Sequence, residues 1–339
     1  MNNRYLKLLE ELKHTKAEPL HKDSRVLIVD GLNTFIRSFA ASPVTNDDGL
    51  HIGGISGTLL SIGHAIKTVD PTRVIVVFDG KNGAKRRREV FPEYKANRKF
   101  KIRLNRSEDV GEEDDGQLRQ LMRLVEYMSY MPFSIVTAEG VEADDVIGYL
   151  VNEKFKDQCY IMSSDKDFLQ LVNERVRIWS PTKKRLYYSP DIVEEYGIHP
   201  NNFVLYRALT GDKSDNIPGV DGLGLKTLIK LYPQLAEETK LSVDDIINYA
   251  ATQPKSKMCV KLTQSREIIE RNLGLMQLSE AFIPTASKLK ILNSVDNPSR
   301  LVKYKFQSML FEDRMTTAIK NVDMWTREVL QKLDGYLLD

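Results

Sequence analysis

Apolar runs of strand length recur in the first half of the chain, each followed by polar residues. They lie at 25–31 (RVLIVDG), 73–80 (RVIVVFDG), 133–140 (FSIVTAEG) and 159–167 (CYIMSSDKD). Stretches with helical spacing of apolar residues separate the runs, notably residues 53–69 and 116–130. Apolar strands that alternate with helices are typical of a parallel sheet covered on both faces. The pattern therefore predicts an α/β fold with a mostly parallel central sheet flanked by helices.

The remaining parts of the chain show one hairpin and further helical patterns. Residues 176–189 (VRIWSPTKKRLYYS) favour two strands joined by a Pro-Thr-Lys-Lys turn. Between residues 203 and 233, two helical pieces surround the sequence GDKSDNIPGVDGLGLKT, and residues 285–339 are mostly helical in pattern. Residues 1–24 carry leucines on one helical stripe, which predicts a separate short helix at that end.

Composition places the chain among intracellular globular proteins. Its 339 residues are 42% hydrophobic, enough for a sizeable core, and its charges nearly cancel at a net +2. The two cysteines, Cys159 and Cys259, show no paired spacing, which argues against a disulfide framework or a zinc site. The start is too charged for a signal peptide, and no apolar run approaches a membrane span. We expect a soluble cytoplasmic protein (in the host cytoplasm if a phage encodes it) without a membrane partner.

Acidic residues stand where apolar runs stop. Four aspartates do so: Asp30, Asp79, Asp165 and Asp167. Parallel strands bring their carboxyl ends to one edge of a sheet, so these side chains are expected to share one crevice. Three more acids crowd into GVEADDVIGYL at residues 140–150. Like charges at this spacing raise one another's pKa and cost stability unless a cation joins them.

The acids together predict a metal site. Hard divalent cations take oxygen ligands, and two Mg²⁺ ions can clamp a phosphodiester, one activating water and the other steadying the leaving oxygen. The candidate ligands are carboxylates from five segments: Asp30, Asp79, Glu142, Asp144, Asp145, Asp165, Asp167, Asp212 and Asp215. No histidine or cysteine lies near these motifs, which disfavours zinc.

Each acid also has an ordinary structural interpretation. An aspartate after a strand most often caps a helix or stands in a turn, and this applies to Asp30 and Asp79. SSDKD is also typical of a helix cap, EADD of an acidic first helical turn, and GDKSDN of a loop. The conjunction of all five segments favours a shared metal site over five unrelated caps.

A glycine-rich turn, GVDGLGLKT at residues 219–227, indicates phosphate binding. Gly222 and Gly224 allow a tight hairpin with exposed backbone amides, and Lys226 and Thr227 then open a helix. Amides at a helix N-terminus bind phosphate without reading bases. The alternative is an ordinary connection between two helices.

A basic stretch at residues 85–106 indicates a nucleic-acid contact. It is densely basic, contains Arg87, and carries the aromatic residues Phe91 and Tyr94, either of which is a candidate to stack on a base. The alternative is a solvated or disordered run of charge.

The order and spacing of these motifs resemble a known family. VDG, VVFDG, FPEYKANR, GVEADDVIG, SSDKDFLQL and GDKSDNIPGVDGLGLKT follow one another as in the 5′-nuclease superfamily of flap endonucleases and 5′–3′ exonucleases. The likeness is greatest to bacterial and phage forms, such as phage enzymes of the ribonuclease H type and the 5′-nuclease domain of DNA polymerase I. It spans residues 25–285. It implies a PIN-like core and a phosphodiesterase with two Mg²⁺ ions, replaceable by Mn²⁺, that removes RNA primers and 5′ flaps during lagging-strand synthesis and repair.

The resemblance assigns roles to matching positions. It implies that one ion is held by Asp30, Asp79, Glu142 and Asp144, and the second by Asp145, Asp165, Asp167, Asp212 and Asp215. Lys95 and Arg98 match residues that contact the scissile phosphate, and Tyr94 matches an aromatic that packs on the terminal nucleotide. Contacts with DNA are implied for Arg87, Tyr94, Lys95, Arg98, Gly222, Gly224, Lys226 and Thr227. In this family the hairpin often binds K⁺ through backbone carbonyls.

Pattern and resemblance together predict four regions. They are an N-terminal helical extension (1–24), a catalytic core (25–200) with a helical arch (81–115), a helix-hairpin-helix DNA-binding region (201–285) and a helical C-terminal extension (286–339). The run SEDVGEEDDG (107–116) makes the arch unusually acidic. No polymerase pattern follows, so we expect a stand-alone enzyme.

Competing functions are weaker but remain open. A haloacid-dehalogenase-like phosphatase needs a second aspartate two positions after its nucleophile, and Leu32 stands there after Asp30. A PIN-type ribonuclease would not need the glycine hairpin. The alternative that we retain is a non-catalytic, structure-specific DNA-binding protein on the same fold.

Expected partners are nucleic acids and replication proteins. We expect a monomer that binds DNA or an RNA–DNA hybrid with a 5′ end or flap. The C-terminal extension is the expected contact for a single-strand-binding protein or a sliding clamp. Within it, FQSMLFED (306–313) faintly resembles a clamp-binding peptide, although such a pattern is more often a core helix.

Overall fold

A six-stranded sheet lies at the centre of the protein. The computed structural model describes residues 20–97, 110–279 and 282–337, with the backbone alone for residues 110–115. The strands are β1 (Arg25–Asp30), β2 (Arg73–Val77), β3 (Phe133–Val136), β4 (Gln158–Met162), β5 (Val176–Ser180) and β6 (Arg185–Tyr187). Their order is β3-β2-β1-β4-β5-β6, parallel throughout except for β6, which is antiparallel to β5. The predicted sheet and the predicted hairpin at residues 176–189 are both confirmed.

Side chains of the central strands alternate between two cores. Val26 and Ile28 of β1 belong to one buried cluster, whereas Leu27 and Val29 belong to the other. The alternation follows from the pleat of a strand, which sends successive side chains to opposite faces. Because both faces are covered, each strand is a continuous apolar run in the sequence rather than an alternating one.

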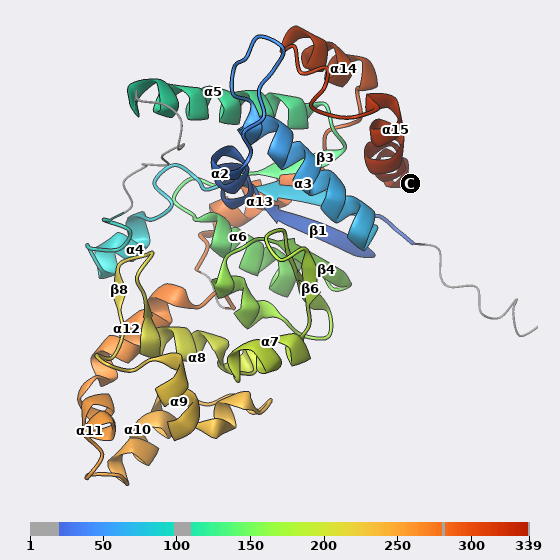
Figure 1. The fold of residues 1–339 in the computed structure, drawn as a ribbon. Helices are drawn as coiled ribbons and strands as arrows, with labels where there is room; N and C mark the ends of the chain where they lie inside the picture. Colours follow the sequence, from blue (N-terminus) through green and yellow to red (C-terminus); the bar gives the residue numbers. More distant parts are fainter. Residues whose placement is uncertain (1–19, 98–109, 280–281, 338–339) are drawn as a thin grey trace, which may run out of the picture.

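Helices cover both faces of the sheet (Figure 1). On the face of Leu27 lie α2 (Gly31–Ala41), α3 (Gly53–Val69), α5 (Val110–Ser129), α14 (Lys303–Glu312), α15 (Val322–Thr326), a π-helical turn (Arg327–Gln331) and α16 (Lys332–Tyr336). On the face of Val26 lie α6 (Ala143–Tyr149), continued by a π-helical turn (Leu150–Lys154), and α13 (Thr285–Asp296). The helices predicted at 53–69 and 116–130 are present, the second beginning six residues earlier.

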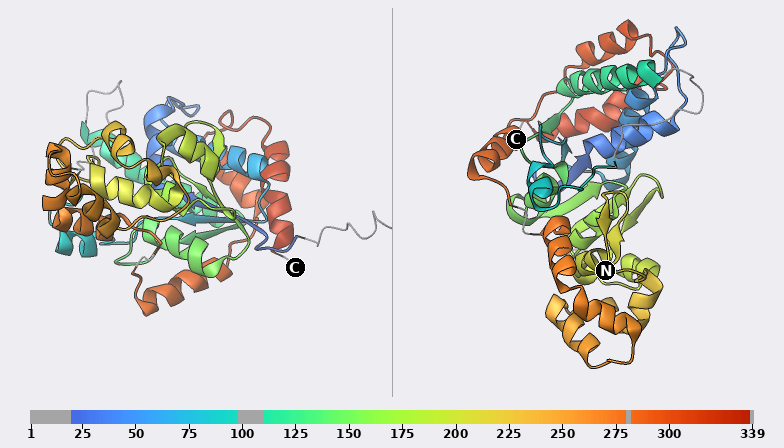
Figure 2. Two further views of the ribbon diagram at one scale, coloured as in Figure 1. Left: turned by 90° about the horizontal axis from the view of Figure 1, so that it is seen from below. Right: turned by 90° about the vertical axis from the view of Figure 1, so that its left-hand side faces the viewer.

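Most of the remaining helices belong to the carboxyl half of the chain. The remaining helices are α4 (Lys85–Val90), α7 (Ser189–Tyr196), α8 (Pro200–Thr210), α9 (Leu225–Leu231), α10 (Val243–Ala251), α11 (Lys257–Gln264), α12 (Arg266–Met276) and 3₁₀ turns at Lys166–Leu171 and Pro233–Ala236. Between α8 and α9, the short strands β7 (Gly211–Asp212) and β8 (Ile217–Pro218) pair antiparallel. Helices α9–α12 form the end of the molecule opposite α5 and α14, as both figures show (Figure 2).

The C-terminal extension wraps around the edge of the sheet. Helix α13 packs on one face, and the chain then passes edge strand β3, where Ser299 N donates to the Phe133 carbonyl at 2.9 Å. Helix α14 follows on the other face, where Phe306 and Met309 are buried and Trp325 stacks on Phe306 at 5.8 Å between ring centroids. Of the apolar residues in 306–313, Phe306, Met309 and Leu310 are buried in the core, whereas Phe311 is 76% exposed. The core-helix interpretation therefore fits, and the clamp contact stays a prediction.

Several predictions fall outside what the structure tests. The predicted N-terminal helix lies largely on residues 1–19, outside the described residues, and so do the central arch residues 98–109. The boundaries of the four regions stay predictions. Within the described ranges, no helix is both long and apolar enough to cross a membrane.

Candidate active site

The carboxyl ends of β1 and β4 are tied together through Asp30. This buried aspartate ends β1 and caps α2, accepting a hydrogen bond from Asn33 N at 3.2 Å. Its other oxygen accepts from Ser163 Oγ, directly after β4, at 2.9 Å. The cap interpretation of Asp30 is therefore correct, and the same geometry aims the carboxylate at the crevice between the two strands.

Asp79 joins the end of β2 to the start of α6. Its Oδ1 accepts from Ala143 N, the first residue of that helix, at 2.8 Å. Asp144 follows Ala143 in the first helical turn. The aspartate after one strand thus fixes the helix that carries the crowded acids.

Four aspartates from separate segments share one electrostatic environment. Burial raises the pKa of Asp144 well above its usual range, and the charges of Asp165, Asp30 and Asp79 raise it further, against the opposing charge of Lys95. Burial also raises the pKa of Asp30 to about 7, with Asp165 and Asp79 adding to the shift and hydrogen bonds from Ser163 and Asn33 opposing it. The predicted convergence of strand-end acids is thus present.

A second acidic group lies beside the first. Asp165 caps the 3₁₀ turn and accepts from Asp167 N at 2.9 Å. Burial, and then the charge of Asp165, raise the pKa of Asp167 to about 7, although Arg207 donates to Asp167 at 2.7 Å. Arg207 also donates to Asp212. Burial alone would raise the pKa of Asp212, but hydrogen bonds from Ser214 and the charge of Arg207 hold that pKa below its usual value.

These carboxylates fit a divalent metal by their chemistry. The donor set consists of hard oxygen ligands, and several of them are buried close enough to disfavour one another's charged form, which a cation among them would relieve. In the part of the chain that the structure describes, no three acidic, histidine or cysteine side chains already form a closed ligand set. The fit therefore rests on the donor set and its mutual repulsion.

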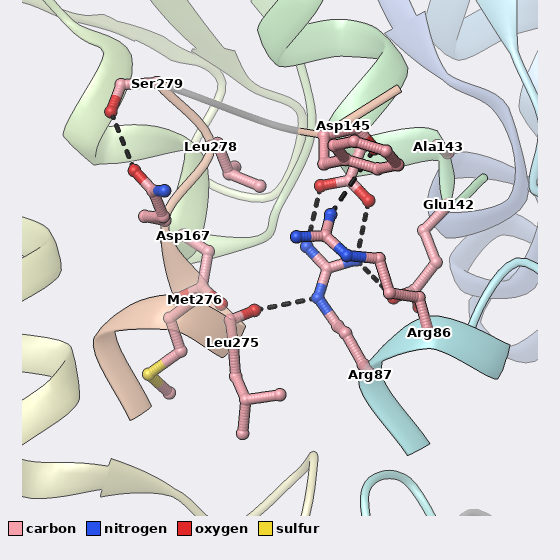
Figure 3. Close-up of polar contacts among 12 residues, drawn as sticks. Arg86, Arg87, Glu142, Ala143, Asp145, Asp167, Leu275, Met276, Leu278 and Ser279 are labelled. Atoms are coloured by element: carbon pink, nitrogen blue, oxygen red, sulfur yellow. Dashed lines mark hydrogen bonds and ion pairs between the residues drawn. The ribbon is translucent and has the colours of Figure 1, made fainter. Parts of the chain in front are cut away.

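Arg87 binds two of the predicted metal ligands. Its guanidinium donates to Glu142 at 2.5 Å and to both oxygens of Asp145 at 2.7 Å (Figure 3). The side chain of Arg87 is only 12% exposed. Its donors thus face protein carboxylates, and a contact of Arg87 with DNA stays a prediction. Both oxygens of Asp145 face Arg87, and its role as a metal ligand stays a prediction.

Tyr94 is buried rather than presented to a nucleotide. Its side chain is 3% exposed, and its hydroxyl donates to the two oxygens of Glu142 at 3.3 and 3.4 Å. Lys95 also donates to Glu142, and its backbone N–H donates to the Asp215 carbonyl at 2.9 Å. The ring has no free face in this arrangement, and its packing on the terminal nucleotide stays a prediction. Its hydroxyl positions Glu142.

A hollow of about 670 Å³ opens beside these residues. It is bordered by Leu32 and by charged residues of both signs: Asp79, Lys85, Arg88, Lys95 and Glu142. Lys95 therefore reaches the same hollow as the acids, where a phosphate would meet both. Arg98, predicted as its companion, lies outside the described residues.

The predicted glycine hairpin lies on the surface. Gly222 has φ +77°, a left-handed conformation that favours glycine, and it is exposed. Gly224 precedes the first turn of α9, in which Lys226 and Thr227 are exposed. The four predicted hairpin residues thus lie together in the first turn of α9 and in the loop directly before it, on a different element from the acids.

Several residues of the site were not expected from the sequence. Arg207 pairs with two acids, and its signal is a base on the helix that leads directly into GDKSD. Ser163 holds Asp30, and the serine pair of SSDKD was its signal. Asn272 donates to the carbonyls of Ala208 (2.9 Å) and Pro218 (2.8 Å), across the hairpin between α8 and α9, and no local pattern indicates it.

Comparisons with known proteins agree with this geometry. Residues 25–197 match the 5′-3′ exonuclease N-terminal resolvase-like domain, and residues 198–296 match the 5′-3′ exonuclease C-terminal SAM fold. The chain is 33% identical over 313 residues to the 5′-3′ exonuclease of Aquifex aeolicus, covering 90% of this chain and 97% of that protein. The protein described here therefore belongs to the 5′-3′ exonuclease family, a group of phosphodiesterases.

Two further similarities extend the comparison. The chain is 37% identical over 212 residues to the thermostable DNA polymerase I of Thermus filiformis, where the match covers 62% of this chain but only 24% of that polymerase. Among solved structures, the bacteriophage T5 flap endonuclease in a complex with DNA and metal ions superimposes with a TM-score of 0.62 at 26% identity. That match covers 86% of this chain and 100% of the phage protein.

Proposed function

We propose that this protein is a Mg²⁺-dependent 5′–3′ exonuclease and flap endonuclease that acts on branched or nicked duplexes. The observation that carries the proposal is the convergence of Asp30, Asp79, Asp144 and Asp165 from four segments beside a hollow that also contains Lys95. A cluster of carboxylates without histidine or cysteine suits Mg²⁺ or Mn²⁺.

The two acidic groups suggest how two ions are held. Asp30, Asp79, Asp144 and Asp165 would hold one ion, with Glu142 a further candidate because it borders the same hollow. The second ion would be held by Asp167, Asp212 and Asp215. When bound, such ions polarise the phosphate and lower the pKa of the attacking water. Lys95 would bind the scissile phosphate as a cation that borders the same hollow.

The remaining parts of the chain suggest a grip on the duplex. Gly222, Gly224, Lys226 and Thr227 would bind one phosphate strand without reading its sequence, and K⁺ at the hairpin carbonyls is part of the proposal. A protein that grips phosphates and cleaves at a 5′ end suits the removal of 5′ flaps and RNA primers during lagging-strand synthesis and repair. RNA–DNA hybrids are therefore proposed substrates beside DNA, and the monomer is the proposed form.

Cleavage of a 5′-labelled flap duplex tests the proposal. We expect release of the labelled strand with Mg²⁺ or Mn²⁺, none with EDTA, and a loss of more than about a hundredfold for Asp144→Asn, since removal even of an outer partner of a metal site costs that order. A parallel substrate with an RNA 5′ segment tests primer removal. Tight binding without cleavage in any metal would instead favour a structure-specific DNA-binding protein.

A further inference from the structure

Arg87, on α4, connects this helix to both α6 and α12 through hydrogen bonds. Its Nη atoms donate to Asp145 and Glu142 at the start of α6, and its Nε donates to the carbonyl of Leu275, near the end of α12, at 2.8 Å (Figure 3). The side chains of Asp145 and Glu142 are 9% and 4% exposed. A guanidinium is suited to this place because it presents several donors in one rigid plane.

The contact with Asp145 sets the direction of the neighbouring Asp144. Consecutive residues of a helix point about 100° apart, because a turn contains 3.6 residues. Arg87 holds Asp145 on one side of α6, and Asp79 holds the backbone of Ala143 at its first residue. Asp144, between these two fixed residues, lies close enough to Asp165, Asp30 and Asp79 for their charges to act on it.

The contact with Leu275 links this arrangement to the hairpin region. Asn272, one turn before Leu275 on α12, donates to the carbonyls of Ala208 on α8 and Pro218 on β8. Hydrogen bonds and a short length of helix thus run from the β7–β8 hairpin through α12 to Arg87, and from Arg87 to α6. A displacement of α12 would be transmitted to the acids by a rigid, buried group.

We propose that Arg87 is a positioning residue that holds Asp144 in its cleaving orientation and couples that orientation to the position of α12. The inference rests on the proposed function and adds a residue to it. Arg87 acts through Asp145 and Glu142 rather than on the nucleic acid. Its role therefore depends on the shape of the guanidinium and not only on its charge.

The test compares Arg87→Lys and Arg87→Gln with Arg86→Gln. Arg86 is the next residue on α4, carries the same charge, is exposed, and lies over the Phe282 ring at 4.8 Å, with no ion pair to α6 among the described residues. For both Arg87 variants we expect kcat on the flap substrate to fall about a hundredfold with KM changed less than about threefold, as a small misplacement of a reacting group does. We expect Arg86→Gln to keep kcat, with any loss confined to KM and to the salt dependence of binding, because Arg86 belongs to the basic stretch.

Measurements that do not depend on turnover complete the test. In the metal-free protein we expect faster amide hydrogen exchange in residues 142–149 of both Arg87 variants, with the central strands β1 and β4 unchanged. Calorimetric titration with Mn²⁺ alone should show that both Arg87 variants bind the ion more weakly than the unchanged protein does. The double variant Arg87→Gln with Asp145→Asn should show a smaller fold-loss of kcat than the product of the two single fold-losses, because it removes both members of a buried pair.

The outcomes separate this inference from the proposed function. If the unchanged protein does not cleave, the proposed function fails. If it cleaves, and Arg87→Lys has the same kcat and the same amide hydrogen exchange as the unchanged protein, the positioning role is refuted while the nuclease function stands. If the loss lies in KM and in the salt dependence of binding, Arg87 contacts DNA and the inference is overturned.

Discussion

Gly63 of α3 lies directly against the indole of Trp325. A Cβ built on Gly63 would stand 2.9 Å from both Cζ2 and Nε1 of that ring, closer than carbon and nitrogen atoms pack. Trp325 is 8% exposed and stacks on Phe306. A salt bridge from Lys67, one turn further along α3, to Glu328 at 2.6 Å lies beside this contact. The C-terminal extension is therefore part of the core and needs a glycine beneath it.

The first prediction concerns this contact. Alanine is a better helix former than glycine, yet Gly63→Ala should lower the free energy of unfolding by about 1–3 kcal/mol, because the buried ring cannot move aside cheaply. Urea unfolding measures the change. Gly335→Ala is the matched control on α16, where a Cβ would meet no atom within 4 Å. We expect the control to be neutral or stabilised by up to about 1 kcal/mol. A Gly63→Ala protein as stable as the control would show that Trp325 does not dock there in solution.

The second prediction separates two roles for Tyr94. A stacking residue would tolerate phenylalanine, whereas a residue that positions Glu142 through its hydroxyl would not. We expect Tyr94→Phe to lower kcat about tenfold, in line with about 1.5 kcal/mol for a lost hydrogen bond to a charged group, while DNA affinity is unchanged. Flap cleavage and binding by the same variant give both numbers. Full activity in Tyr94→Phe together with weak binding in Tyr94→Leu would favour the stacking interpretation.

Local patterns in the sequence were enough for the sheet and for the crevice of acids. Each central strand is covered on both faces, so its apolar run is unbroken and easy to recognise, and parallel strands necessarily bring Asp30, Asp79 and Asp165 to one edge. The glycine hairpin was recognisable for a similar reason, because a left-handed residue such as Gly222 favours glycine.

Ion pairs between distant segments could not be predicted in this way. Arg87 is separated by 55 and 58 positions from Glu142 and Asp145, and by 188 from Leu275, and no local pattern records which base meets which acid. A run of bases such as KRRREV therefore suggested one shared role in DNA binding. In the fold, one of its arginines is buried against the carboxylates of Glu142 and Asp145.

The third prediction concerns the hairpin. Lys226 is exposed in the first turn of α9, beside the surface glycines, so Lys226→Ala should weaken duplex binding and lower the slope of log K against log salt by about 1. Fluorescence anisotropy at several salt concentrations measures the slope. Lys230→Ala, exposed at the other end of the same helix, is the charge-matched control and should leave the slope unchanged. A change in kcat without a change in slope would remove Lys226 from the duplex contact.

The fourth prediction concerns pH in the metal-free protein. Burial raises the folded-state pKa of Asp30 to about 7, whereas the unfolded chain releases that proton near the ordinary pKa of 3.8. Between these values the folded state binds more protons than the unfolded state, so the free energy of unfolding falls as pH rises. For Asp30 alone, the fall between pH 5 and 8 should be about 2–3 kcal/mol, at roughly 1.4 kcal/mol for each pH unit. Urea unfolding in EDTA at both pH values measures it, and Asp30→Asn should flatten the dependence by that amount. Added Mg²⁺ should reverse the trend, since a cation favours the charged carboxylate, and a metal-free protein more stable at pH 8 than at pH 5 would show that Asp30 is ionised in the folded crevice.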